Sequence, residues 1–488
     1  MVLLRNLLVL LCLTALSIAT AGQGYEIKVK ITGLADNQVI LGHYLSKSMY
    51  PDDTAKIDSK GYGVFSGSKK LPGGMYLIYL PSSRYFDVVI GEDQAFTIET
   101  DTLDFLKSMV IKGSDENQLF LDFQRYMASL RAQAESLTQL IKSQSDSKEK
   151  EQLTTKLKEI NENRISRIES IKKDHPGLFI SEFLMATLDV TVPDPPKDEN
   201  GVVKDSAWQY YYYRTHYFEN FNVADPRMLR TPFYEDKIMT FLTKVIPQFP
   251  DSIIPQVDYF IEKSRCDSGL FRFMLITLFN YYGKSNIMGM DAVQVHIADK
   301  YYIRESWWSD AKFVADLKDR TEKATPLLIG AIAPDAELMS IPPEHFKSAL
   351  SDTALKRYPH VGTKINLRQV KAKFLVLLFW EADCGHCKTA VPELHKIYEK
   401  SLQHLDVKIL AISTLFGEDG KAKWVDFVNE HSLYDWINAW NPYSYDFKLK
   451  YDVLSTPQIY ILDENKKIIA KKISPEQVEE IISSLVNR

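Results

Sequence analysis

The spacing of hydrophobic and polar residues changes along the chain, and its first regular pattern is that of strands. In residues 25–112 short apolar runs alternate with polar residues, as Tyr25, Ile27, Val29 and Ile31 do in YEIKVKI. Alternation with a period of two is typical of strands that have one buried face. Turn sequences such as ADNQ, PDD and PGG separate the runs. We therefore expect five or more short strands in a small antiparallel sandwich or barrel.

The spacing becomes helical near Ser114. Two sets of apolar residues that recur every three or four positions predict two long amphipathic helices, separated by the polar segment SQSDSKEK at residues 143–150. A coiled-coil dimer is a more specific alternative, but the heptad repeats are too few and too irregular to favour it. Proline-rich VPDPPKDENG at residues 192–201 predicts a loop, and residues 205–320 return to a helical pattern.

Aromatic residues are dense in this second helical stretch, above all in WQYYYYRTHYFENF at residues 208–221. Such a run could serve as a stacking platform for sugars or bases. A buried helix that packs its rings is the commoner structure, and we expect it here and for Trp307 and Trp308. Cys266 is expected to pack as a small hydrophobic residue and not to act as a reactive thiol.

Beyond residue 325 the pattern alternates between strand and helix. KFLVLLFW at residues 373–380 is almost continuously apolar, as a central strand buried on both faces must be. A second buried strand is expected at residues 407–413, a strand pair within residues 458–470, and helices between and after them. A βαβ unit followed by a hairpin and a closing helix predicts a mixed α/β sheet.

The length of 488 residues agrees with several domains, because single cores rarely grow beyond about 250–300 residues. The predicted division is a signal peptide (1–21), an all-β sandwich (22–113), an all-α middle domain (114–324) and an α/β domain (325–488). Hydrophobic residues make up 45% and charged residues 25%, as in globular proteins. The net charge of -5 gives no reason to expect nucleic acid or an anionic membrane as a partner.

The first 21 residues have the pattern of a secretory signal peptide. Arg5 supplies the positive charge, an apolar run follows at residues 7–18, and ATA at residues 19–21 fits the small-x-small cleavage rule. The alternative is a retained anchor helix, but the apolar run is short for a membrane span. Cys12 follows a leucine, where a lipoprotein signal needs a small residue, so we expect no lipid anchor. After cleavage the chain is not expected to cross a membrane.

Cleavage leaves three cysteines, and two of them, Cys384 and Cys387, form a C-x-x-C motif in WEADCGHCK. A structural zinc site usually needs four ligands, and the third thiol, Cys266, belongs to another predicted domain. A structural disulfide that closes so short a loop restrains little of the unfolded chain. At a strand-to-helix turn the motif instead predicts a redox couple, which needs neither a metal nor a cofactor.

The predicted chemistry follows from the positions of the two thiols. Cys384 is expected in the first turn of the helix, where free N–H groups and the helix dipole favour a thiolate that attacks a substrate disulfide. Cys387, one turn further and less exposed, then resolves the mixed disulfide. Gly385 keeps the approach open, and His386 can stabilise the thiolate. The carboxylate of Glu381 raises the pKa of the thiol if it points towards it.

FWEADCGHC resembles the active-site strand and turn of the thioredoxin superfamily, above all the secreted thiol–disulfide oxidoreductases of the TlpA and ResA type. Trp380 matches the tryptophan that precedes the motif in this superfamily, and Pro392 the proline that kinks the first helix. Thr456 and Pro457 lie just before the strand QIYILD, where the family places a cis-proline that faces the redox pair and helps to hold substrate. The resemblance covers about residues 325–488 and implies a thioredoxin-like fold.

Two positions depart from the family. Thioredoxin keeps a buried aspartate six residues before the first cysteine, where this chain has Leu378. ResA-like proteins often carry a glutamate three residues after the second cysteine, where this chain has Ala390. Both family residues accept the proton of the resolving thiol, so a substitute is needed. Glu381, Glu393 or water could take that role for Cys387.

The resemblance implies a periplasmic oxidoreductase of a Gram-negative bacterium. It acts on protein disulfides, exchanges electrons with a thiol donor or acceptor, and contributes to redox homeostasis. LPGGMYLIYLP and AFTIETDTLD also resemble the sandwich that precedes such domains in Bacteroidota proteins, where a helical middle domain follows. The candidate partners of these front domains are another protein, a glycan or a second copy of the chain.

Two alternatives belong to other classes. A thiol-dependent peroxidase of the AhpC/TSA type shares the fold, but its cysteine usually needs a proline and a threonine or serine upstream. Those positions hold Leu377 and Glu381 here, which argues against a peroxidase. The other alternative is a binding or scaffold protein whose thioredoxin-like domain only docks partners. The intact C-x-x-C motif and the Thr-Pro pair argue against it.

Overall fold

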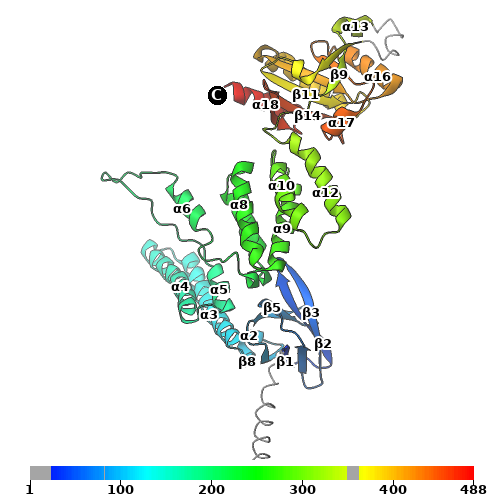
Figure 1. Cartoon of the computed structure of the whole chain (residues 1–488). Coiled ribbons are helices and arrows are strands. Elements are labelled where there is room, and N and C mark those ends of the chain that lie inside the picture. Colours follow the sequence, from blue (N-terminus) through cyan, green and yellow to red (C-terminus); the bar gives the residue numbers. More distant parts are fainter. Residues whose placement is uncertain (1–23, 82, 349–361, 488) are drawn as a thin grey trace, which may run out of the picture. The chain divides into compact units, whose positions relative to one another are not determined.

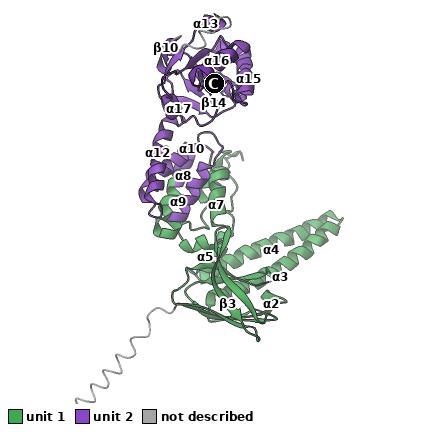
Figure 2. Ribbon diagram, turned by 90° about the vertical axis from the view of Figure 1, so that its right-hand side faces the viewer, with its two compact units in different colours: residues 1–247, 258–271 green, residues 248–257, 272–488 purple. Residues whose placement is uncertain are grey.

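The computed structural model describes residues 24–81, 83–348 and 362–487. The expected signal peptide, with Cys12, lies outside these residues. The chain forms two compact units, which Figure 2 shows in different colours: residues 1–247 with 258–271, and residues 248–257 with 272–488. The first unit contains the strands of the front domain and most helices up to residue 247. The second contains the remaining helices and the C-terminal α/β domain.

The first unit opens with two four-stranded sheets, in the orders β4-β1-β7-β8 and β3-β2-β5-β6 (Figure 1). Their inward-facing residues form one apolar cluster, as a sandwich requires. The strands are β1 Tyr25–Thr32, β2 Asn37–Leu45, β3 Ser48–Ile57, β4 Tyr62–Gly67, β5 Gly74–Tyr79, β6 Tyr85–Ile90, β7 Ala95–Asp101 and β8 Val110–Lys112.

The predicted sandwich is confirmed, but it is not wholly antiparallel. Strands β1 and β7 pair in parallel, with Ile27 opposite Phe96 and Val29 opposite Ile98. A parallel pair needs a long crossover connection. The chain provides one here, because it builds β2, β3, β5 and β6 of the other sheet, as well as β4, before it returns to β1.

Two long helices follow the sandwich, as the sequence predicts. The break between them falls within the expected polar segment, because α3 ends at Ser143 and α4 begins at Ser147. The helices of the described residues up to 324 are α2 Phe105–Ser108, α3 Asp115–Ser143, α4 Ser147–Asp174, α5 Phe179–Ala186, α6 Trp208–His216, α7 Tyr234–Thr240, α8 Pro250–Lys263, α9 Ser268–Gly283, α10 Asp291–Ile297, α11 Ile303–Glu305 and α12 Ala311–Ala324.

The aromatic helix α6 is not buried, contrary to expectation. None of its residues is buried, and Tyr211 is 54% exposed. Its rings instead stack along the helix surface, with the centroids of Trp208 and Tyr212 5.2 Å apart. Aromatic residues fill consecutive positions here, and a period of 3.6 residues spreads them around the helix instead of gathering them on one face. The aromatic core begins after the helix, at Tyr217 and Phe221.

Two further packing predictions in the middle of the chain are wrong. Trp307 is 62% exposed, in the turn between α11 and α12. Cys266 is also exposed, because it lies in a short 3-10 turn between α8 and α9. The Cys266 thiol donates a hydrogen bond to the carbonyl of Ala224, with Sγ 2.9 Å from the oxygen.

The C-terminal domain is built on a seven-stranded mixed sheet in the order β10-β9-β13-β12-β11-β14-β15. Its strands are β9 Glu337–Ser340, β10 Thr363–Asn366, β11 Phe374–Trp380, β12 Val407–Ser413, β13 Ile437–Trp440, β14 Gln458–Asp463 and β15 Ile468–Lys471. Its helices are α13 Pro343–Ser348, α15 Cys387–Ile397, α16 Gly417–Glu430, α17 Asp446–Lys450 and α18 Pro475–Val486 (Figure 1).

Strand β11 is the centre of this sheet, and every one of its residues is buried. It runs parallel to β12 and antiparallel to β14. Its alternate residues supply two separate cores. Leu378 and Trp380 pack in the cluster that includes α15, α16 and α18, while Leu377 and Phe379 pack in the cluster on the opposite face. The apolar run thus forms the buried central strand that the sequence predicts.

Within the described part of the chain, no helix has the length and apolar character that a membrane span requires.

Candidate active site

The two cysteines lie where β11 meets α15. The strand ends at Trp380, and the helix begins at Cys387 with His386 as its N-cap. The sequence predicts Cys384 in the first turn of the helix. The structure has it in the turn before the helix instead. The reason is local: the Cys384 N–H is held by the carbonyl of Glu381 at 3.2 Å, in a turn that closes before the helix starts.

The amino end of the helix nevertheless faces the Cys384 thiol. Partial burial opposes ionisation of this thiol. Hydrogen bonds to the sulfur from the Thr456 side chain and from the backbone N–H groups of Cys387 and His386 outweigh that effect, and the pKa of Cys384 is lowered. The two backbone donors are among the unpaired N–H groups that every helix start leaves available to an anion. Cys384 is thus the thiol from which a proton is removed more easily.

The Cys387 thiol has the opposite character. It is fully buried, and burial raises its pKa to about 12, although the backbone N–H of Glu381 and the Thr456 side chain donate to its sulfur. Both cysteines are in the free thiol form. At neutral pH the pair therefore consists of one partly exposed, acidic thiol and one buried thiol that keeps its proton.

The loop before β14 brings Thr456 and Pro457 to the cysteines, 72 residues along the chain from Cys384. The Thr456–Pro457 peptide bond is cis, as the family resemblance implies. The carbonyl of Thr456 accepts a hydrogen bond from the Cys384 thiol, with Sγ 3.3 Å from the oxygen. The Thr456 side chain interacts with both sulfurs. The pairing of β14 with β11 sets this position, because the strand that carries the motif and the strand that follows the loop are neighbours.

Replacing Thr456 with valine is expected to raise the pKa of Cys384. Valine keeps the shape of threonine but has no hydroxyl to donate to the thiolate, and a lost hydrogen bond to the charged form disfavours it. Since only the thiolate is alkylated, the rate with iodoacetamide rises with pH and is half-maximal at the pKa of Cys384. The midpoint should move to higher pH in Thr456→Val and stay near the native value in Thr456→Ser. Equal midpoints in all three proteins would exclude a role for the hydroxyl.

The other predicted motif residues divide between surface and core. Gly385 and His386 are exposed, and a Cβ atom added at Gly385 would meet nothing within 4 Å, so this residue leaves the approach to the Cys384 sulfur open. Trp380 is fully buried, and its ring lies 4.9 Å from that of Phe427, centroid to centroid. Its contacts are with the core, so it anchors the end of β11 beneath the motif.

The acidic residues near the motif are paired with lysines. Glu381 accepts a hydrogen bond from the Thr414 hydroxyl at 2.5 Å, and one of its oxygens lies 3.5 Å from Nζ of Lys448. Asp383 lies 2.8 Å from Nζ of Lys423, which lowers the pKa of Asp383. Each lysine offsets a carboxylate charge that would otherwise oppose the thiolate.

The sequence could not have revealed these partners, since Thr414 follows β12 and the two lysines lie on α16 and α17. Leu378, at the position where thioredoxin keeps a buried aspartate, is buried in β11. Glu393 shares a hydrogen bond with Glu476, at the start of α18, and this bond raises the pKa of Glu393. Glu393 thus interacts with α18 and not with the sulfurs. Glu381 contacts the redox pair directly, because its backbone N–H donates to the Cys387 sulfur.

Comparison with known families agrees with this geometry. Residues 329–471 match the model of the AhpC/TSA family. These residues contain the central strand β11, the C-x-x-C turn, helix α15 and the hairpin β14–β15. The C-terminal domain is thioredoxin-like. In front of the thioredoxin-like domain, residues 25–120 and residues 144–324 match two families described as domains of unknown function, DUF4369 and DUF5106. No curated protein matches the chain.

Several solved structures are similar to the chain. A thioredoxin-like protein from Bacteroides caccae is 18% identical over 61% of this chain and 99% of its own, with a TM-score of 0.41. The thioredoxin domain of a thiol-disulfide oxidoreductase from Bacteroides vulgatus is 21% identical over 32% of this chain and 97% of its own, with a TM-score of 0.26. A thiol:disulfide interchange protein from Bacteroides sp. is 21% identical over 33% of this chain and 91% of its own, with a TM-score of 0.26.

Proposed function

We propose that the protein is a periplasmic thiol–disulfide oxidoreductase that acts on disulfides of other proteins. One observation carries the proposal: the two thiols of the thioredoxin-like domain are adjacent but differ in character. Cys384 is partly exposed with a lowered pKa, and Cys387 is buried with a pKa raised to about 12. A dithiol of this kind has a nucleophile and a resolving thiol assigned by their surroundings. The signal-like first 21 residues support a location outside the cytoplasm.

The reaction is a two-electron exchange in two steps. The Cys384 thiolate attacks one sulfur of the substrate disulfide, forms a mixed disulfide, and releases the other substrate sulfur as a thiolate, which takes up a proton. Cys387 then gives up its proton and attacks Cys384, forming the Cys384–Cys387 disulfide and releasing the second substrate thiol. The substrate gains two electrons and two protons, and a thiol donor returns the domain to the dithiol. In reverse, the same steps oxidise a substrate dithiol.

In this proposal Glu381 takes the proton from Cys387. Its backbone N–H donates to the Cys387 sulfur, and its carboxylate is held by Thr414 and Lys448. Thr456 and Pro457 hold the substrate chain beside Cys384 in this proposal. The redox couple contributes to redox homeostasis in the compartment where the protein acts, and the front domains supply the surface for a partner.

A peroxidase is the alternative that shares the fold, and the site favours it less. Leu377 is fully buried in β11, where it contributes to the core. Glu381, at the position where a peroxidase places a hydroxyl residue, offers a carboxylate that pairs with Lys448. A negative charge repels the developing oxygen anion of a peroxide. A protein that only docks partners does not need two adjacent thiols that differ in pKa and burial, so this alternative does not account for the site.

The Cys387→Ser variant is expected to trap its substrates. It keeps the Cys384 nucleophile but cannot form the intramolecular disulfide, so the mixed disulfide accumulates. Incubation with oxidised insulin, followed by non-reducing electrophoresis and mass spectrometry, should show insulin chains attached at Cys384. Cys266→Ser, which removes the exposed thiol outside the motif, serves as the matched control and should turn over like the native protein. Normal turnover by Cys387→Ser would contradict the two-cysteine mechanism.

A further inference from the structure

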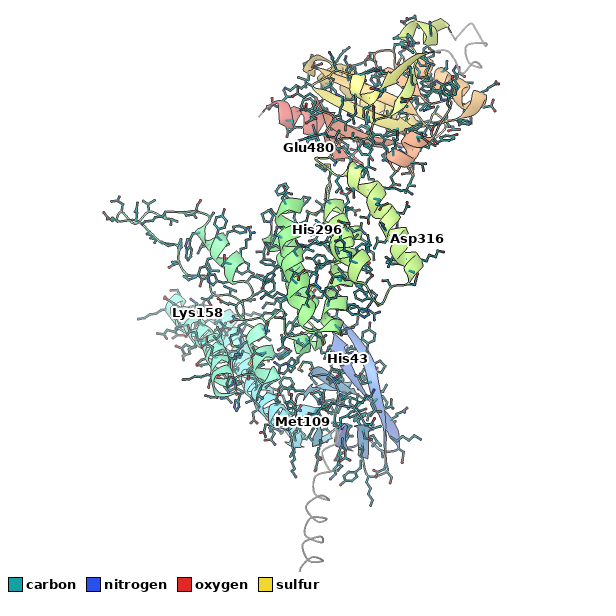
Figure 3. All side chains as sticks on the ribbon, in the orientation of Figure 1. His43, Met109, Lys158, His296, Asp316 and Glu480 are labelled. Atoms are coloured by element: carbon teal, nitrogen blue, oxygen red, sulfur yellow. The ribbon has the colours of Figure 1, made fainter. Side chains whose placement is uncertain are left out.

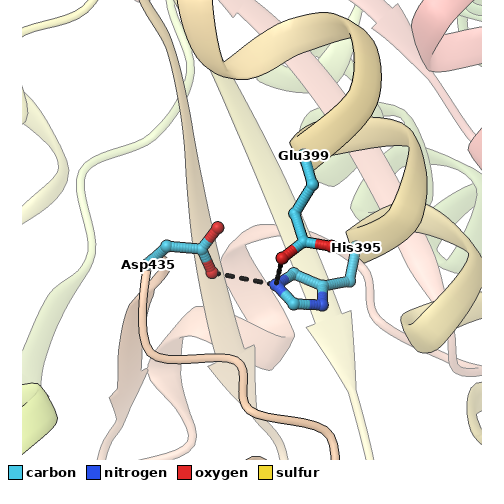
Figure 4. Close-up of side chains that lie close together, drawn as sticks. All are labelled: His395, Glu399 and Asp435. Atoms are coloured by element: carbon cyan, nitrogen blue, oxygen red, sulfur yellow. Dashed lines mark hydrogen bonds and ion pairs between the residues drawn. The ribbon is translucent and has the colours of Figure 1, made fainter.

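Three side chains that could bind a metal converge on one face of the thioredoxin-like domain, away from the motif. His395 lies on α15, Glu399 one turn further along, and Asp435 in the connection between α16 and β13 (Figure 4). Nε2 of His395 lies 3.0 Å from Oδ1 of Asp435 and 3.9 Å from Oε1 of Glu399. The three potential ligand atoms all lie within 4.8 Å of one another.

The histidine is held in place, whereas the carboxylates are open to solvent. The His395 side chain is 11% exposed, and its ring meets that of Trp436 edge to face, with centroids 5.4 Å apart. This contact helps to fix the direction of Nε2. The side chains of Glu399 and Asp435 are 60% and 27% exposed. An incoming ion therefore has access from water and finds one ligand already oriented.

The charges of the cluster are incompletely balanced. Two carboxylates share one imidazole, and in the described chain no lysine or arginine pairs with Glu399 or Asp435. A divalent cation would satisfy both carboxylates with the imidazole in its neutral form.

The distances suit a small metal ion. Zinc binds imidazole nitrogen at about 2.0–2.1 Å and carboxylate oxygen at about 2.0–2.2 Å, usually in a tetrahedron. Neighbouring ligand atoms of such a tetrahedron are about 3.4 Å apart, which follows from those bond lengths. The separations of 3.0 and 3.9 Å bracket this value. The carboxylate oxygens of Glu399 and Asp435 lie within 4.8 Å of each other, and the exposed Glu399 side chain is free to turn towards the other two ligands.

We propose that His395, Glu399 and Asp435 bind a Zn²⁺ ion, with water as the fourth ligand. One nitrogen and two oxygen ligands with an open position form a donor set that zinc accepts. Glu399 lies in the π-helical turn Tyr398–Leu402, which directly follows α15. The ion ties the helix that starts at Cys387 to the connection before β13.

The zinc site is separate from the redox pair, and its test must keep the two apart. His395 follows Cys387 by eight residues on the same helix. Thiolates also bind zinc, so the test uses the full chain with all four cysteines, Cys12, Cys266, Cys384 and Cys387, changed to serine, with folding checked by circular dichroism. Because this chain has no redox activity, the result does not depend on the proposed function.

The thiol-free chain is titrated with Zn²⁺ in competition with a chromophoric chelator, and with Co²⁺ for its absorption bands. We expect one Zn²⁺ per chain and Co²⁺ bands of a four-coordinate site with nitrogen and oxygen ligands. His395→Gln and Glu399→Gln should each weaken Zn²⁺ binding at least about 10-fold. Glu399 is exposed, so its amide variant tests the site even if His395→Gln unfolds.

The matched control is His43, which lies on β2 in the other compact unit (Figure 3). Nδ1 of His43 lies 2.7 Å from Asp52, so this is also a histidine–carboxylate pair, but one outside the three-ligand cluster. His43→Gln should leave the affinity for Zn²⁺ unchanged. Two results would overturn the proposal. One is no Zn²⁺ binding by the thiol-free chain at micromolar concentration, and the other is an equal affinity for Zn²⁺ with and without the Glu399→Gln change.

Discussion

Changing Cys384 to serine is expected to abolish disulfide reduction, with a loss of about 10³-fold or more in the rate with oxidised insulin. A serine hydroxyl is not ionised at neutral pH, so the thiolate-stabilising hydrogen bonds from Thr456 and from the helix start have no anion to act on. The buried Cys387, with its pKa raised to about 12, cannot take over as the nucleophile. Activity is measured by insulin precipitation with dithiothreitol as donor.

The matched control for this loss is Cys266→Ser. Cys266 is exposed and belongs to the other compact unit, so its removal should leave the rate unchanged. A Cys384→Ser protein with more than about a tenth of native activity, or a Cys266→Ser protein that loses most of it, would assign the chemistry to a different thiol.

Changing Trp380 to alanine is expected to lower the free energy of unfolding of the thioredoxin-like domain by about 3–5 kcal/mol. The side chain is fully buried at the end of β11 and packs on Phe427, so its removal leaves a large cavity beneath the motif. Trp380→Phe should cost less. Phenylalanine keeps most of the ring contacts, and the indole N–H has no hydrogen-bond partner to lose in the described structure.

The Cys387 thiol reports this change, because it is fully buried and is alkylated only when its surroundings open. After rapid blocking of Cys384 in the reduced protein, Cys387 should be alkylated at least about 100-fold faster in Trp380→Ala than in the native chain, since each 1.4 kcal/mol corresponds to about a factor of ten. Trp380→Phe should fall between the two. If all three proteins protect Cys387 equally, the tryptophan does not support the motif.

The main elements of the fold could be predicted because their patterns are local. The apolar run at residues 373–380 has only one stable place, the centre of a sheet covered on both faces, and β11 lies there. The polar segment between α3 and α4 likewise has no apolar face to bury, so the helix breaks within it. Patterns of this kind show which residues must be buried, and the need to bury them decides where these strands and helices begin and end.

The predictions were wrong where one sequence pattern is compatible with more than one structure. Helix α6 is rich in aromatic residues, yet tyrosine hydroxyls can remain in water, so its rings pack on one another at the surface. The parallel pairing of β1 with β7 depends on a crossover of more than 60 residues, which no local turn signal announces. Cys384 precedes α15 because a single hydrogen bond to the Glu381 carbonyl fixes the turn.

The site could be predicted in part for the same reason. The C-x-x-C motif and the Thr-Pro pair are contiguous in sequence, and the structure places Thr456 beside both sulfurs. The lysines that pair with Glu381 and Asp383 come from other elements, so only the fold could bring them there. His395 and Glu399, four residues apart on a helix, gave a signal that the sequence analysis missed, but Asp435 joins them only through the fold.

The central claim is that Cys384 and Cys387 form one reversible two-electron couple. Its most direct test is equilibration of the full chain with glutathione or dithiothreitol buffers of defined potential, followed by alkylation and mass spectrometry of each cysteine. The account predicts that both residues are oxidised together in a single two-electron transition, between about -270 and -120 mV, the range of thioredoxin-fold couples, while Cys266 stays a free thiol. Independent oxidation of the two cysteines, or a disulfide that includes Cys266, would contradict it.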